Sequence, residues 1–192
     1  MKNKKTTILV LALLIIIASL YRVWDNRPWG FAPQIAMALF AGSVISNKKF
    51  SFLVPLLSML IGDILYQMLY MQGLSELKGF YQGQWLNYIL FTAITVIGFF
   101  IKKNNIGFII LGSLAGVVFF FLTSNFFDWI GGGLDINNQP YPKTFDGLMK
   151  CFAAGLPFLK GSLWATLFFN GIFFGSYYLY CRYIVKAQTQ TA

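Results

Sequence analysis

Six apolar segments follow one another along the chain, interrupted by isolated polar residues and separated by short polar stretches. Each segment is close to the roughly 20 residues that an α-helix needs to cross the hydrocarbon core of a bilayer. The pattern therefore predicts an all-α integral membrane protein, a six-transmembrane-helix bundle that forms a single domain over residues 1–192. The predicted helices cover about residues 6–24, 31–46, 52–71, 85–101, 107–130 and 161–184.

The first apolar segment follows a basic start, as a cleaved signal peptide also would. No good small-x-small cleavage site follows it before the loop that begins at Arg22, which favours a retained first helix.

The last connection, "GGGLDINNQPYPKTFDGLMKCFAAGLPFLKG", is long for a small bundle. Apolar residues recur in it at helical spacing, with Asp146 and Lys150 four apart on the polar side. We expect a short amphipathic helix that ends near Gly155 and Pro157, as either an interfacial anchor or a lid over a pocket. The apolar positions are Phe145, Leu148, Met149 and Phe152.

Charged residues make up 11% of the chain and hydrophobic residues 57%, whereas soluble domains carry about a quarter charged residues. The net charge of +9 indicates a membrane orientation rather than a nucleic-acid surface, because the basic residues cluster in alternate connections. Both termini are therefore expected to be cytoplasmic, in the inner (cytoplasmic) membrane. The connections on that side carry Lys2, Lys4, Lys5, Lys48, Lys49, Lys102, Lys103, Arg182 and Lys186.

The chain contains no histidine, which removes most metal sites and the commonest general base. It has no G-x-x-x-x-G-K-[ST] motif for ATP, and its two cysteines, Cys151 and Cys181, fall on opposite sides of the predicted membrane. We expect no enzyme activity, no metal and no cofactor.

Polar side chains gather in the outer halves of at least four predicted helices, at similar depth. This arrangement predicts a polar cavity that opens outward, although each amide or hydroxyl could instead hold two helices together. Asp63 differs, since a charge near the bilayer centre costs at least about 2.5 kcal/mol, and we expect it to be protonated, paired or facing a ligand. The polar candidates for substrate binding are Asp63, Gln67, Asn87, Ser124, Asn125, Asp128, Asn170 and Arg27.

All five tryptophans fall near the predicted outer boundary, as an aromatic belt would. They could equally form pocket walls that stack on a planar ligand. Trp29 and Trp129 are the candidates for that second role, because they lie beside Arg27 and Asn125 in the sequence.

Three stretches, "NRPWGFAPQIAMALFAG", "PLLSMLIGD" and "SNFFDW…YPKTFDGLMKCFAAGLPF", together resemble a family of uncharacterised six-helix membrane proteins described as candidate transport proteins. That family is similar to the substrate-binding S components of energy-coupling-factor vitamin transporters. The resemblance extends from about Arg22 to Phe158 and implies a bundle that binds a small nutrient from outside.

The resemblance also implies partners, namely a transmembrane coupling protein and two ATPases, in addition to the lipid bilayer and the small-molecule ligand. The first helix departs from the S-component pattern, because it lacks the A-x-x-x-A through which such proteins dock. Ala32 and Ala36 could replace that motif, or the protein could work alone.

The leading expectation is a membrane protein for binding and uptake of a vitamin-like nutrient, energised by a separate module. Two alternatives stay open. One is a structural six-helix protein of the cell-envelope machinery, and the other is a secondary transporter in which Asp63 exchanges a proton.

Overall fold

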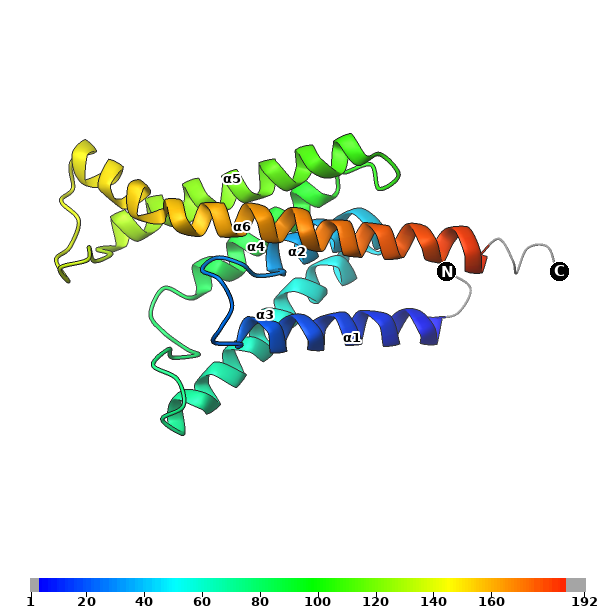
Figure 1. The fold of residues 1–192 in the computed structure, drawn as a ribbon, viewed down its shortest axis with the longest axis horizontal. Helices are drawn as coiled ribbons and strands as arrows, with labels where there is room; N and C mark the ends of the chain where they lie inside the picture. The colour runs from blue at the N-terminus through cyan, green and yellow to red at the C-terminus, as the bar shows by residue number, and fades with distance from the viewer. Residues whose placement is uncertain (1–3, 186–192) are drawn as a thin grey trace.

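The computed structural model describes residues 4–185, with side chains described for residues 11–182, and the chain is all-α apart from its connections (Figure 1). All six predicted helices are present. They are α1 (Lys4–Arg22), α2 (Gln34–Val44), α3 (Lys48–Met71), α4 (Trp85–Gly98), α5 (Ile106–Gly131) and α6 (Phe145–Leu179), which continues into the π-helical turn η1 (Tyr180–Val185).

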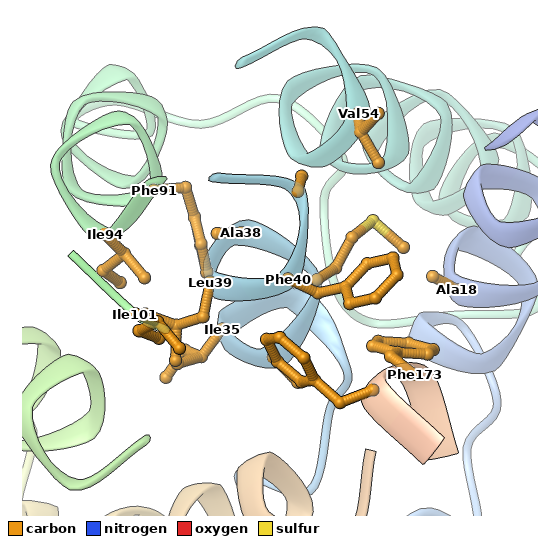
Figure 2. Packing of buried hydrophobic residues seen from close by; sticks show 14 of the residues in the cluster. Ala18, Ile35, Ala38, Leu39, Phe40, Val54, Phe91, Ile94, Ile101 and Phe173 are labelled. Carbon is orange, nitrogen blue, oxygen red and sulfur yellow. The ribbon is translucent and has the colours of Figure 1, made fainter. Parts of the chain in front are cut away.

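The short helix α2 forms the centre of the fold and packs against α3, α4, α5 and α6. Its side chains point outward in all directions toward these neighbours, as Figure 2 shows. Phe40, for example, meets the rings of Phe173 and Phe174 with centroid separations of 5.6 and 5.2 Å. Because nearly every residue of α2 is buried, the helix shows no amphipathic pattern of its own.

The connections lie at two opposite ends of the molecule (Figure 1). We call the end with residues 23–33, 72–84 and 132–144 the acidic-loop end, because Asp25, Glu76 and Asp135 lie there. The end with residues 45–47 and 99–105 is the basic-loop end, which carries Lys102 and Lys103 and borders Lys48. Helix α1 begins and α6 ends at the basic-loop end.

Some helix bounds differ from the predicted ones. Asn47 accepts a hydrogen bond from the backbone N–H of Lys49, so α3 begins at residue 48 rather than 52. Helix α2 is shorter than predicted and begins after Pro33, whereas α4 ends at Gly98 and residues 99–101 continue as turns. Helices α1 and α5 lie within two residues of their predicted bounds.

The expectation of a separate amphipathic helix in the last connection is wrong, because that segment is the first part of α6. Thr144 caps it by accepting from the N–H of Gly147, and the helix runs through Pro157 without ending. A proline removes one backbone hydrogen bond, and the rest of a long packed helix tolerates that loss. Figure 1 shows α6 bending in this first part. Asp146 and Lys150, four residues apart on the polar side, form an ion pair at 2.7 Å.

Three helices of the described residues are long and apolar enough to cross a membrane, namely α3, α5 and α6 with its continuation. The apolar parts of α1, α2 and α4 within that range are shorter. Eleven residues make α2 only about 16 Å long, roughly half of a hydrocarbon core.

Candidate functional site

A cavity of about 610 Å³ lies at the acidic-loop end, where the connections 23–33 and 72–84 meet the helices. We call it the acidic-end cavity. Its volume is within the range of sites for small organic ligands. Rings and polar groups share its walls, and the polar groups belong to Arg22, Asp25, Arg27, Gln34, Tyr66, Tyr81, Asn87 and Ser162.

The predicted special role of Asp63 has a structural basis, because its carboxylate is 1% exposed and fully partnered. Arg22 Nη1 donates to Oδ1 at 2.5 Å, and Tyr88 Oη donates to Oδ2 at 2.5 Å. The same Arg22 nitrogen donates to the carbonyl of Met59 at 3.0 Å. The carboxylate thus joins α1, α3 and α4. Arg22 lines the cavity and Asp63 does not.

Gly62 and Gly79 allow this arrangement by leaving room beside α3. A Cβ at Gly62 would lie 2.8 Å from Arg22 Nη1, and one at Gly79 would lie 1.8 Å from the backbone oxygen of Asp63. The connection 72–84 therefore rests directly on the α3 backbone at this level. Gln67, another predicted site residue, helps to hold this connection, because its Oε1 accepts a hydrogen bond from the N–H of Phe80. It does not line the cavity.

Arg27 also lines the cavity and is held by the C-terminal end of α1. Its Nε donates to the carbonyl of Arg22 at 2.8 Å, and Tyr66 Oη donates to that same carbonyl at 2.7 Å. Cations are favoured at a helix C-terminus. Among the residues described, Arg27 has no carboxylate within ion-pair distance, so it retains positive charge for a ligand.

Asn87 and Tyr81 form a second polar wall, with Asn87 Nδ2 donating to Tyr81 Oη at 2.8 Å. Desolvation raises the pKa of Tyr81 above its ordinary value, so its hydroxyl stays protonated and can donate at neutral pH. Gln34 supplies an acceptor: it is 4% exposed, and its Oε1 has no hydrogen-bond partner among the described residues. Buried amide oxygens are normally satisfied, so this atom marks a position for a donor.

Aromatic rings form much of the remaining walls, together with aliphatic side chains such as Ile35 and Met59. Trp29 stacks on Phe158 with a centroid separation of 5.6 Å and an interplanar angle of 10°, and Phe91 lies 5.3 Å from Phe120. Trp29 is 72% exposed, so the ring face that does not contact Phe158 is free to stack on a ligand. The loop that carries it lies close to α6, since a Cβ at Gly161 would lie 1.9 Å from the carbonyl oxygen of Trp29.

Four predicted site residues lie elsewhere, where α5 is joined to α6. Ser124 and Asn125 both donate to the carbonyl of Phe121, and Asn125 packs against Gly155. None of the four lines the acidic-end cavity. They are Ser124, Asn125, Asp128 and Trp129.

Asp128 and Trp129 hold the α5–α6 connection in place. Cys151 Sγ lies 3.8 Å from Asp128 Oδ2, and Trp129 Nε1 donates to the carbonyl of Pro142 at 2.8 Å. Lys143 caps the C-terminus of α5 by donating to the carbonyls of Trp129 and Ile130.

Asn170, the last predicted residue, is buried between α5 and α6, and its Nδ2 donates to Ser113 Oγ at 2.7 Å. The acidic-end cavity therefore brings together three of the ten candidates, Arg27, Trp29 and Asn87. It adds Tyr81, which helical periodicity could not reveal because it lies in a connection. Within the described residues, no group of three or more His, Cys, Asp or Glu side chains could hold a metal ion.

Comparison with known proteins identifies a family. No curated protein and no solved structure matches the chain. The match is to a family described as "Family of unknown function (DUF6580)", and it covers residues 2–189. Since this is nearly the whole length of the sequence, the chain belongs to that family of unknown function.

Proposed function

We propose that this protein is an integral membrane protein that binds a small, vitamin-like nutrient in the acidic-end cavity and delivers it for uptake. The observation that carries the proposal is the cavity itself, with a volume of about 610 Å³ and walls that combine aromatic rings with a few convergent polar groups. Ligand sites in proteins commonly have this composition.

The polar groups indicate how such a ligand would be recognised. Arg27 offers a cationic donor, Gln34 Oε1 an acceptor without a partner among the described residues, and Asn87 an amide in the cavity lining. The exposed face of Trp29 can stack on a flat ring. A heteroaromatic nutrient with an N–H or O–H donor and one acidic or carbonyl group matches this set.

In this proposal the six helices form a membrane bundle in which the short helix α2 is shielded by its neighbours. Irregular backbone at membrane depth is tolerated where protein covers it, as the connections beside α2 would be. The acidic-loop end faces outward, because basic connections remain in the cytoplasm. The chain has no P-loop motif, and we propose that a transmembrane coupling protein with two ATPases supplies the energy for uptake.

The proposal is tested by thermal-shift measurements on the detergent-purified protein with a panel of vitamins and their precursors. A ligand at about 100 times its Kd stabilises the folded state by roughly 2.7 kcal/mol. We expect Arg27→Gln and Asn87→Ala to weaken the response to that ligand. Asn125→Ala is the matched control, since it also removes an amide near the acidic-loop end but not from the cavity.

Absence of any shift across a broad panel, with the protein well folded, would contradict ligand binding and favour a structural role. An equal loss in Asn125→Ala and Asn87→Ala would place the ligand outside the acidic-end cavity.

The orientation has its own test, which uses a membrane-impermeant maleimide on whole cells. Asn137→Cys lies in the exposed connection after α5 and should be labelled, whereas Lys102→Cys at the basic-loop end should not. The reverse result would turn the cavity toward the cytoplasm and exclude direct capture from outside.

The ion pair of Arg22 with Asp63 supports a second candidate, proton-coupled transport, because ionisable groups at membrane depth often mark proton pathways. Asp63→Asn removes the titrating group while keeping two hydrogen-bonding atoms. Transport that is normal in this variant and independent of pH would exclude this candidate.

A further inference from the structure

A second hollow, of about 620 Å³, lies between α5 and α6 in the half of the molecule near the basic-loop end. We call it the α5–α6 groove. Figure 1 shows these two helices diverging toward the end at which α5 begins. It shares no lining residue with the acidic-end cavity.

The groove is mostly apolar and open along α6. Its lining also contains Ser113 and Asn170, which are hydrogen-bonded to each other, and Asn170 Oδ1 has no further partner among the described residues. Gly171 and Gly175 lie one turn apart, and a Cβ added at either would meet nothing within 4 Å. Leu167 and Phe174 also contribute to α6's side of the groove, and isoleucines of α5 form the other side. A flexible hydrocarbon chain therefore has space along these glycines.

The mouth of the groove is cationic. Lys103 lines it, with Nζ held 3.0 Å from Tyr177 Oη and 5.1 Å from the centroid of that ring, and Asn104 lies beside it. The chain has six acidic residues, and none of them lies near this mouth, since they belong to the acidic-loop end and to the outer parts or middle of the helices. They are Asp25, Asp63, Glu76, Asp128, Asp135 and Asp146.

The length of the groove distinguishes between occupants. Along α6 it extends from Leu167 to Tyr178, which is about 17 Å of helix. One leaflet contributes about half of the roughly 30 Å hydrocarbon core. The groove is thus matched to one lipid of one leaflet, whereas a transmembrane helix of a partner would need the full thickness.

We propose that the α5–α6 groove binds an anionic phospholipid of the cytoplasmic leaflet, with the phosphate at Lys103 and Asn104 and one acyl chain along Gly171 and Gly175. Basic pockets between helices on the cytoplasmic side are suited to such headgroups. This inference and the proposed function share two assumptions, namely that the chain spans a bilayer and that its basic-loop end faces the cytoplasm. It requires no ligand in the acidic-end cavity.

The test is native mass spectrometry of the purified full chain, titrated with phosphatidylglycerol or phosphatidylcholine. We expect a preference for phosphatidylglycerol, and about a five-fold loss of that preference in Lys103→Gln. Lys49→Gln is the matched control, because it removes one exposed charge at the same end but away from the groove. Gly175→Leu should weaken binding of both lipids by filling the groove.

Three results would overturn the proposal. Equal retention of the two lipids by the parent protein would show that the groove has no site for an anionic headgroup. Equal effects of Lys103→Gln and Lys49→Gln would show that the preference comes from general attraction between the lipid and the positive charge of this end. Unchanged lipid binding in Gly175→Leu would exclude the groove. If that variant also lost a crosslinked dimer, the groove would be a contact between two copies instead.

Discussion

Two polar clusters lie toward the acidic-loop end, one where α1, α3 and α4 meet and one where α5 joins α6. In the first, Asp63 is neutralised by Arg22 from another helix, and neighbouring polar groups line a cavity. In the second, Asn125 bonds to its own helix and Trp129 bonds to the following connection. Similar side chains thus form a candidate site in one place and a helix junction in the other.

The difference comes from what each cluster packs against. The first borders two connections, 23–33 and 72–84, which meet the helices without filling the space between them. The second borders the start of α6, which lies so close that Gly155 contacts the Asn125 amide. Polar groups at a given depth become a site only where the surrounding backbone leaves a space.

The largest effect that separates the clusters is expected from Asp63→Ala. The substitution leaves Arg22 largely buried without its carboxylate, and breaking a buried pair costs roughly 3–5 kcal/mol. Thermal unfolding in detergent should show a large fall in Tm or loss of the monodisperse protein. Recovery in the double variant Asp63→Ala with Arg22→Leu would confirm the unpaired charge as the cause. A near-normal Tm in the single variant would contradict the structural role of the pair.

A smaller effect is expected from Gly161→Ala, which tests how closely the Trp29 loop approaches α6. The new Cβ would lie 1.9 Å from a backbone oxygen, and overpacking of this kind costs roughly 1–3 kcal/mol. Gly171→Ala on the same helix is the control, since its Cβ meets nothing within 4 Å. We expect a lower Tm only for Gly161→Ala, together with weaker binding of any ligand found in the screen. Equal Tm values would show that the loop does not press on α6.

The second cluster is tested by Trp129→Phe, which keeps an aromatic ring but loses the hydrogen bond to Pro142. Loss of one such bond lowers stability by about 1 kcal/mol. Ligand affinity should stay unchanged, because Trp129 does not line the cavity. Trp29→Ala should show the opposite pattern, with weaker ligand binding and a small change in Tm. Ligand loss in Trp129→Phe would assign the second cluster to the site.

The smallest effect is expected from Lys150→Gln, which breaks the pair with Asp146 near the start of α6. Both side chains are mostly exposed, at 64% and 71%, and water and salt screen such pairs. No measurable change in Tm is expected at physiological salt. A clear fall in Tm would show that this part of α6 is buried in a complex or at the membrane surface.

The elements themselves were predictable, because long apolar runs separated by polar stretches leave little choice of structure. The segment around Phe145 was recognised as helical from its spacing, but its continuity with α6 was not. Pro157 is typical of a helix end in isolation. The cap at Thr144 and the packing of α6 against α5 and α2 are contacts that the local sequence pattern does not record.

The candidate site was less predictable from the sequence, because it too depends on contacts between segments that are far apart in the chain. Asp63 was identified from the cost of a buried charge, and its need for a partner follows from the same cost. The identity of that partner depended on which helix lies beside α3, and Arg22 is 41 residues away in sequence. Tyr81 became a candidate only when the connection 72–84 was placed over the helices.

The apolar runs in the sequence were enough to predict the number of helices and the approximate bounds of most of them, because apolar length is a local property. The exception is α6, which begins at residue 145 and not at residue 161. The sequence also determined that the charged connections alternate between two ends. The tertiary structure decided that α2 is the buried centre and that Arg22 neutralises Asp63. It also decided which polar groups face a cavity and which close a junction. These outcomes depend on distances between segments far apart in the chain, which no local pattern records.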